Sequence, residues 1–460
     1  MTSSPLPYIL NPSMHPLAVE YNTALAGTVV ETFLSSLGKR LCFPRGIVAQ
    51  AQEAALKKPR FNATAGLARS KNEAFMLPAL RQRLPGLPPA AAVDYAPTGG
   101  DRDLRLMWRA LQQRKNPSLA AVSATLPLVT AGITHALTLA ADLFVDEGDY
   151  MILPEPAWDN YELVLAGKRG AAIARFPFFD DRSRFNSAAL DRLLAAVQPG
   201  GKAALILNFP HNPTGYALSR EEAAALADLL RTHARRGVSV MALVDDAYYG
   251  LCYRDDLEKE SLFARLSDLH EKILAVKLDG ATKEDFAWGF RVGFLTLGFR
   301  GLADTHRPAL ENKLLAAVRV SVSSASRPAQ SLLLELLKND DYNREKEAAF
   351  TVLQRRYQTT ARIISAAASP HLVPLPFNSG YFLTFRTHGV DAYALREYLL
   401  HKNNTGVIAL APDLLRVTYA AVDEEDLPEL FRLIYAAAET LCNSPQSHGD
   451  TQRSTEKEKK

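Results

Sequence analysis

The sequence predicts an α/β protein in which a mostly parallel, seven-stranded sheet is sandwiched by helices and accompanied by a smaller α+β domain. Two observations predict this fold class. From about residue 126 onward, short apolar runs alternate with Ala/Leu-rich segments, and such alternation is typical of a doubly wound parallel sheet. Most of the runs are largely apolar, as expected for strands that helices cover on both faces.

Seven apolar runs are the candidate strands of this sheet. They occupy residues 126–130, 150–153, 171–176, 203–207, 239–244, 273–278 and 292–297. Before them, residues 16–42 carry apolar side chains at helical spacing and predict one helix. Between them, Ser219 is followed three residues later by Glu222, a capping box that indicates the start of a helix.

The chain length predicts more than one domain, because 460 residues exceed what one simple core holds. We expect residues 1–74 to be an N-terminal segment that contributes to the small domain and residues 75–339 to form the large domain. Residues 340–441 would complete the small domain. Residues 442–460 are mostly polar and charged, which predicts a disordered tail.

Composition and charge argue against several classes of partner. Hydrophobic residues make up 47% and charged residues 22%, the balance of a soluble globular protein. The net charge of +3 and its scattered basic residues indicate neither a nucleic acid nor a membrane surface as partner. The sequence has no long apolar run and no signal-peptide pattern, so we expect a cytoplasmic protein. Its three cysteines show neither zinc spacing nor a disulfide framework.

A lysine and an arginine follow the sixth predicted strand. Lys283 comes shortly after residues 273–278, and Arg291 lies eight residues further on. Ligands in open α/β sheets gather at the carboxyl ends of strands. A lysine there can form an imine with an aldehyde once burial and neighbouring groups lower its pKa. Taken alone, the segment fits a surface lysine equally well.

Two neighbouring predicted strands also end in polar side chains. The segment 208–215 directly follows the strand at 203–207 and contains Asn212 in the turn sequence NPTG, and Asp245 directly follows the strand at 239–244 with Tyr248 close behind. A carboxylate delivered by an apolar strand is costly unless it finds a partner, and a pyridinium N–H would be one. A metal ion bound by two adjacent aspartates is the weaker alternative, because no other cluster of oxygen ligands is evident.

A fourth segment has the pattern of a strand, a small turn and a helix. Gly132, Ile133 and Thr134 occupy the turn and the helix start, where backbone N–H groups favour a phosphate. The segment contains neither a Walker lysine nor the GxGxxG pattern. It is therefore a weak indication by itself.

Together and in this order, these segments resemble the class I/II aminotransferases, the aspartate aminotransferase-like enzymes of pyridoxal 5′-phosphate (PLP) fold type I. The resemblance covers about residues 62–416 and rests on NPTG, on the D-x-A-Y segment and on K-x7-R-x-G. It implies PLP as the cofactor, no metal, and Lys283 as the lysine that binds PLP and shuttles a proton. Asp245 would keep the pyridine nitrogen protonated, and Asn212 and Tyr248 would donate to the phenolate oxygen.

The remaining site residues also follow from this resemblance. Gly132, Ile133, Thr134 and Arg291 would form the phosphate cradle, and Trp158 would be the aromatic contact to the ring. Tyr95 would reach the neighbouring subunit's phosphate. Arg416, with Gly66 beside it, would bind the substrate carboxylate. One departure is notable: the family commonly has a serine three residues before the lysine, where this chain has Gly280. Thr282 is a candidate replacement.

The resemblance implies an enzyme of amino acid metabolism that moves an amino group between an amino acid and a 2-oxo acid by a ping-pong mechanism. It also implies a homodimer whose two sites are shared between subunits. A PLP-dependent lyase, acting by β-elimination or decarboxylation, remains an alternative because the same residues serve it. A non-catalytic PLP-sensing regulator is the least favoured, since the first 60 residues show no basic recognition helix.

The choice of substrate stays open at this point. An acidic substrate would need a second arginine, for which Arg319 and Arg327 are candidates, although both fit ordinary surface positions. Phe377, Tyr381 and Phe382 leave an aromatic substrate equally possible.

Overall fold

The computed structural model describes residues 14, 16, 19, 20, 23, 47–64, 68–70, 73, 74, 77–83, 86–88, 91, 92, 94–304 and 306–443. Most of the predicted helix at 16–42, the predicted site residue Gly66 and the predicted tail beyond residue 443 lie outside them. In the part that is described, no helix combines the length and the apolar character that crossing a membrane requires.

The chain divides into two compact units, which are described separately. The first comprises the described residues of Met1–Pro44, Met76–Asn212 and Tyr216–Ala349, and the second those of Arg45–Phe75, Pro213–Gly215 and Phe350–Lys460. The sequence placed domain boundaries at 74/75 and 339/340. The division into domains at these boundaries stays a prediction.

The first unit is built on a seven-stranded sheet whose strand order is β4-β10-β9-β8-β7-β5-β6. Strand β10 runs antiparallel to both of its neighbours, and the other pairs are parallel. This confirms the predicted fold class. The bounds are β4 (Leu128–Thr130), β5 (Tyr150–Glu155), β6 (Ala172–Pro177), β7 (Lys202–Asn208), β8 (Ser239–Asp245), β9 (Ile273–Gly280) and β10 (Gly293–Gly298).

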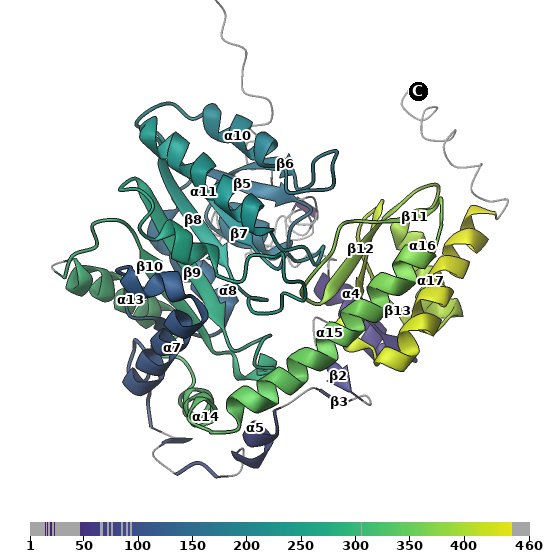
Figure 1. Ribbon diagram of the computed structural model, residues 1–460, viewed down its shortest axis with the longest axis horizontal. Helices are drawn as coiled ribbons and strands as arrows, with labels where there is room; N and C mark the ends of the chain where they lie inside the picture. The colour runs from purple at the N-terminus through teal and green to yellow at the C-terminus, as the bar shows by residue number, and fades with distance from the viewer. Residues whose placement is uncertain are drawn as a thin grey trace, which may run out of the picture. The chain divides into compact units, whose positions relative to one another are not determined.

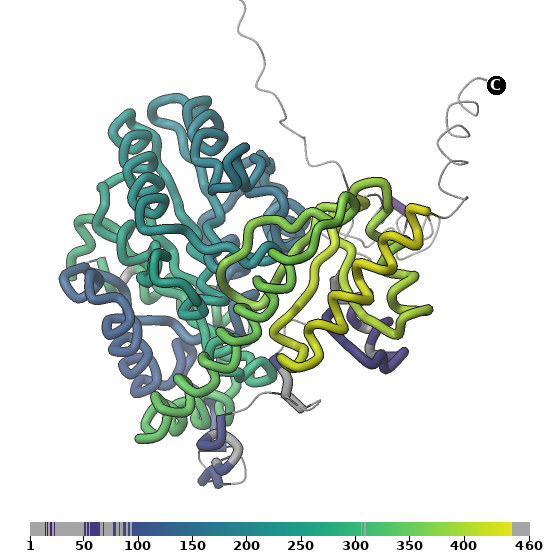
Figure 2. The backbone as a smooth tube through the Cα atoms, turned by 45° about the vertical axis from the view of Figure 1, so that its right-hand side comes forward, coloured from purple at the N-terminus to yellow at the C-terminus, as the bar shows by residue number. Residues whose placement is uncertain are grey.

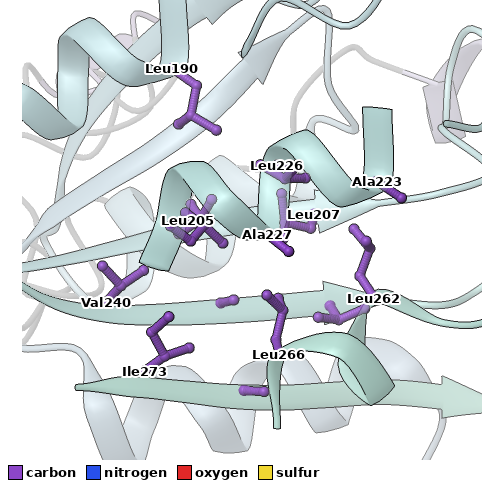
Figure 3. Close-up of a cluster of buried hydrophobic side chains, with 14 of the residues drawn as sticks. Leu190, Leu205, Leu207, Ala223, Leu226, Ala227, Val240, Leu262, Leu266 and Ile273 are labelled. Atoms are coloured by element: carbon purple, nitrogen blue, oxygen red, sulfur yellow. The ribbon is translucent and has the colours of Figure 1, made fainter. Parts of the chain in front are cut away.

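Helices cover both faces of this sheet (Figure 1). Because successive side chains of a strand point to opposite faces, each strand feeds two separate cores. Leu205 and Leu207 of β7 pack with Leu226 of α11 in one core, as Figure 3 shows, whereas Ala204 and Ile206 belong to the other. The first core also contains α10 (Ser187–Ala195), α11 (Arg220–Arg235) and α12 (Leu262–Leu266), and the second contains α8 (Ile133–Phe144) and α13 (Arg307–Ser321).

The predicted capping box begins helix α11. The Ser219 hydroxyl accepts from the Glu222 backbone N–H at 3.2 Å, and the Glu222 carboxylate accepts from the Ser219 N–H at 2.8 Å. Such caps contribute about 1 kcal/mol. The remaining helices of the first unit are α5 (Pro78–Arg83), α7 (Arg102–Lys115), α9 (Asn160–Glu162) and α14 (Arg327–Leu337), with short 3₁₀ helices at Pro117–Ala121 and Trp288–Phe290 and a π-helical turn at Leu163–Lys168.

The second unit centres on a four-stranded antiparallel sheet of order β11-β12-β15-β14. Residues before the first unit's sheet join it: Gln50 of α4 exchanges hydrogen bonds of 2.8 and 3.0 Å with the backbone of Ala409, and Figure 2 shows this purple helix beside the green segments. The strands are β11 (Leu372–Pro374), β12 (Phe382–Thr387), β14 (Ile408–Ala411) and β15 (Leu414–Thr418), with the short pairs β1 (Phe61–Asn62)–β13 (Thr405–Gly406) and β2 (Arg69–Ser70)–β3 (Glu73–Ala74).

The helices of the second unit are α4 (Ile47–Lys57), α16 (Ala392–Lys402) and α17 (Leu427–Cys442), with 3₁₀ turns at Tyr419–Ala421 and Glu424–Asp426. Helix α15 (Tyr342–Ala366) begins in the first unit, and its residues from Phe350 onward belong to the second.

Candidate active site

The polar side chains singled out in the sequence lie at one edge of the first unit's sheet. Strands β7 and β8 end side by side, with Asn208 paired in register with Asp245. Strand β9 ends at Gly280, three residues before Lys283, and β4 ends at Thr130, just before the α8 turn. Because β4 and β9 are both antiparallel to β10, their carboxyl ends lie at this same edge. The chain thus brings four polar segments together where such sheets bind ligands.

Asp245 is a deeply buried ionisable group at this edge, with 2% of its surface exposed. The Tyr161 hydroxyl donates to its carboxylate at 2.6 Å and the Ala247 backbone N–H at 3.0 Å. Burial nevertheless raises the pKa of Asp245 to about 6, although these donors and the charge of Lys283 favour the ionised form. The carboxylate therefore needs a further cationic partner, and a protonated pyridine nitrogen fits that need.

Lys283 and Tyr248 complete the group around this aspartate. The Lys283 ammonium nitrogen lies 5.3 Å from the centroid of the Tyr248 ring, and the ring itself is buried. Tyr248 belongs to the turn that directly follows Asp245, so the end of β8 delivers both side chains. An amine, a phenol and a carboxylate are thereby gathered in the first unit.

An anion cradle lies beside them at the start of α8. Gly132 caps this helix with a φ of 86°, and a Cβ built there would lie 2.9 Å from the Cζ of Arg291. The guanidinium therefore packs directly on the turn whose backbone N–H groups open the helix. A guanidinium next to a helix N-terminus suits a phosphate, because the fork and the helix dipole both favour negative charge.

Asn212 and Trp158 flank the same residues. The Asn212 backbone N–H donates to the Asn208 side chain at 2.8 Å, and Asn208 in turn donates to the Asp245 carbonyl at 2.9 Å. The Trp158 ring meets the Tyr161 ring edge-on, with centroids 5.4 Å apart. The Asn212 backbone and the Trp158 ring are thus placed through partners of Asp245. The aspartate, the lysine and the cradle together fit PLP, which carries a basic ring nitrogen, an aldehyde and a phosphate.

Comparison with known proteins identifies the family. The family model "Aminotransferase class I and II" matches residues 67–434, most of the chain. The chain belongs to this family. An arginine–pyruvate transaminase of Pseudomonas aeruginosa is 28% identical over 322 residues, 70% of this chain and 75% of that protein. A probable aspartate/prephenate aminotransferase of Aquifex aeolicus is 28% identical over 368 residues, 75% of this chain and 84% of that protein.

Solved structures share the fold. An aminotransferase from Anaerococcus prevotii superposes with a TM-score of 0.73 at 24% identity, covering 85% of this chain and 95% of that one. Family and fold together make this protein a PLP-dependent aminotransferase, which transfers an amino group between an amino acid and a 2-oxo acid.

The roles of three further residues implied by the family resemblance stay predictions. Gly66 is outside the described residues. Tyr95 is in the first unit, but 95% of its surface is exposed. Arg416 is in the second unit, on β15, where its guanidinium donates to the Thr64 carbonyl at 3.0 Å and lies 4.4 Å from the centroid of the Phe382 ring. Its role in binding a substrate stays a prediction.

The departure at Gly280 has a structural cause. A Cβ at this position would lie 2.7 Å from the Val292 carbonyl oxygen and 2.9 Å from the Gly293 Cα, so the close approach of β9 and β10 leaves no room for a serine. Thr282 is 8% exposed, and among the described residues its hydroxyl has no hydrogen-bond partner. The chain thus keeps one buried hydroxyl beside Lys283 that is available to a ligand.

The structure gives three of the residues considered for substrate choice other contacts or a place in the core. Arg327 forms an ion pair with Asp101 at 2.6 Å, which already occupies its guanidinium. Tyr381 and Phe382 are fully buried core residues. Sequence reasoning missed Tyr161; its only signal is a position three residues after Trp158, which places the two rings on one side of the turn.

Proposed function

We propose that Lys283, Asp245 and Tyr248 form the catalytic centre of a ping-pong transamination. The observation that carries this proposal is the buried Asp245 carboxylate, whose raised pKa marks a group held for a cationic partner beside an amine and an anion cradle. Bound PLP supplies an electron-withdrawing ring that stabilises negative charge on the substrate's α-carbon.

The side chains would divide the work as follows. Asp245 holds the proton on the ring nitrogen. Lys283 would hold the cofactor covalently through its amine, and the same amine, once freed, would move the proton of the substrate's α-carbon. Tyr248 and Asn212 would donate hydrogen bonds to the cofactor's phenolate oxygen, which would lower the pKa of the Lys283 nitrogen in its cofactor-linked form. Trp158 would pack against the cofactor ring.

The cradle would hold the phosphate. Gly132, Ile133 and Thr134 offer backbone and hydroxyl donors at the start of α8, and Arg291 offers its guanidinium. The Thr282 hydroxyl is the candidate for the contact that Gly280 cannot make, since it is buried and available.

The substrate would be an amino acid whose α-carboxylate binds to Arg416, with Gly66 beside it. The two relatives described above are named for arginine and pyruvate and for aspartate and prephenate, so they leave the substrate side chain open. The ion pair of Arg327 with Asp101 argues against this arginine as a second carboxylate site. Arg319 stays a candidate for that role.

We further propose that the protein is a homodimer with shared sites and that it is located in the cytoplasm. Tyr95 supports the dimer, because a large aromatic side chain that is 95% exposed fits a residue that reaches the partner subunit's phosphate.

A panel of amino donors tests this function. Purified protein supplied with PLP would be incubated with each donor and with pyruvate or 2-oxoglutarate, and the products separated. Transamination predicts that the donor's 2-oxo acid and the acceptor's amino acid form in equal amounts. Release of ammonia without an acceptor would instead support the lyase alternative and contradict the proposal.

A further inference from the structure

Two carboxylates follow Lys283 directly in the chain. Glu284 is largely buried, and Asp285 is fully buried, with 0% of its surface exposed. Both lie between β9 and β10, where the chain forms turns and one short 3₁₀ helix. Burying two adjacent negative charges is costly unless cations and hydrogen bonds compensate them.

Two lysines from distant helices provide that compensation. The Lys115 nitrogen, at the end of α7, lies 2.5 Å from the Glu284 carboxylate. The Lys346 nitrogen, in the second turn of α15, lies 2.9 Å from Glu284 and 2.7 Å from Asp285. The Tyr342 hydroxyl donates to Asp285 at 2.7 Å. We call Lys115, Glu284, Asp285 and Lys346 the charged anchor; its two positive and two negative charges balance.

The shifted pKa values of Glu284, Lys115 and Lys346 agree with charged forms of these three groups at neutral pH. Burial alone would raise the pKa of Glu284, but Lys115 and Lys346 lower it to about 2. Burial lowers the pKa of Lys115 to about 8, which leaves it mostly protonated at pH 7. Burial also opposes the charge of Lys346, yet Asp285 and Glu284 raise its pKa well above the usual value.

The backbone that carries Lys283 needs such an anchor. Phe286, a buried bulky residue, has a φ of 55°. Left-handed conformations of this kind persist only where the surroundings hold the chain in place. Glu284 also packs on the turn after Tyr248, because a Cβ on Gly250 would lie 2.7 Å from the Glu284 Cδ. The carboxylate therefore meets α7, α15 and the turn that bears Tyr248.

We propose that the residues of the charged anchor are positioning residues for transamination. They fix the Lys283 amine relative to Asp245 and Tyr248, and their own charges sum to zero, so that they add no net charge next to Lys283. This inference rests on the proposed role of Lys283. Removing a lysine of the anchor leaves an uncompensated negative charge on the carboxylates that directly follow Lys283 in the chain, which favours the protonated form of the Lys283 nitrogen. Removing a carboxylate has the opposite effect.

Other ionisable groups surround the same segment, and they are the same in every variant of the test described next. Those placed around Lys283 and the anchor include Asp245, Tyr248, Tyr249, Cys252, Lys277, Asp246 and Tyr342.

A double-variant cycle tests the proposal in the PLP-loaded protein. The measured quantity is the pH midpoint of the visible absorbance change of the lysine-linked cofactor. Lys346→Met is expected to raise this midpoint by roughly one pH unit and Glu284→Gln to lower it by about as much. Combining the two substitutions should return the midpoint to within about 0.3 pH units of wild type, because the charge is again balanced.

Arg105→Met is the matched control, since Arg105 is a buried cation of the same unit that forms an ion pair with Glu311 at 2.8 Å, away from the anchor. It should lower the melting temperature and leave the midpoint unchanged. If Lys346→Met does not fold, Lys115→Met removes a more exposed cation of the anchor and should also raise the midpoint.

Two results would overturn the inference: midpoints that stay at the wild-type value while the melting temperature falls, or shifts of the same sign in both single variants. A wild-type protein without a visible absorbance band would instead refute the proposed function.

Discussion

The two edges of the large sheet differ in what they hold. The carboxyl edge carries Asp245, Lys283 and the cradle at Gly132. The amino edge holds a cavity of about 420 Å³, lined by the first residues of β5, β7, β8 and β9 and by neighbouring loops. Its lining is mainly apolar and includes Phe144, Tyr150, Met241, Leu274 and Phe299.

The difference teaches that a cavity does not by itself mark the site of the chemistry. Apolar walls lower the free energy of an apolar ligand but offer no group that moves a proton or holds a phosphate. At the carboxyl edge, by contrast, a buried carboxylate, an amine and an anion cradle converge from four segments. We therefore propose that the reaction takes place at the carboxyl edge, where burying charged groups costs free energy.

The sharpest test of this contrast replaces one lysine at each edge. Lys283→Ala should abolish the visible absorbance band and lower the rate of transamination by about 10⁴-fold or more, because the covalent link and the proton carrier are both lost. Lys202→Ala, at the amino edge, removes only an exposed ion pair with Asp149 and should change the rate less than about twofold. Borohydride trapping followed by peptide mass spectrometry would locate the cofactor. Trapping at Lys202 would reverse the comparison.

Asp245→Asn should have the second largest effect. An amide cannot hold the proton on the ring nitrogen, so we expect kcat to fall by roughly 10²–10⁴-fold while the visible band persists. Single-turnover measurement of the first half-reaction would check it. A variant with wild-type kcat would show that the buried carboxylate is structural only.

The same substitution should lower activity but raise the stability of the cofactor-free protein. The pKa of Asp245 is about 6 in the folded state, against about 3.9 when unfolded. Between these values the folded state binds more protons, so its stability falls as the pH rises; above about pH 6 the full penalty of about 3 kcal/mol is present. Asp245→Asn should therefore stabilise the cofactor-free protein at pH 8 and have little effect near pH 4, as measured by denaturant unfolding.

Much of the fold was predictable, because strands buried on both faces leave uninterrupted apolar runs. All seven predicted strands are present. The first begins two residues later than expected, at Leu128, since the carbonyls of Leu126 and Pro127 accept from Arg105 instead of pairing in the sheet. Deviations of this kind come from tertiary contacts that no local pattern records.

The candidate site was predictable only where short motifs end a strand. The partners of those motifs were not, because they lie far away in the chain: Tyr161 is 84 residues from Asp245, and Lys115 is 169 residues from Glu284. No periodicity connects such pairs. The sequence thus indicates the groups proposed to react but not the groups that hold them.

Tyr161→Phe should show how much one such partner contributes. The substitution removes the 2.6 Å hydrogen bond to Asp245 and preserves the ring against Trp158. Loss of a hydrogen bond to a buried charge costs about 1.5–3 kcal/mol, so kcat should fall by roughly tenfold or more, and the pKa of Asp245 should rise further. A pH profile of kcat separates this from a packing defect, which would lower kcat equally at every pH.

Filling the amino-edge cavity should have the smallest effect. Ala204 lines the cavity, and its side chain belongs to the core that packs on α8. Ala204→Leu would bury additional apolar surface and should raise the free energy of unfolding by about 1 kcal/mol, or leave it unchanged if packing is imperfect. Because the substituted residue is near the start of β7 and the proposed catalytic groups follow the strands' far ends, kcat and KM should stay within about twofold of wild type. A tenfold loss of activity in a variant of unchanged stability would mean that the cavity communicates with the site, and the two edges could then no longer be treated as independent.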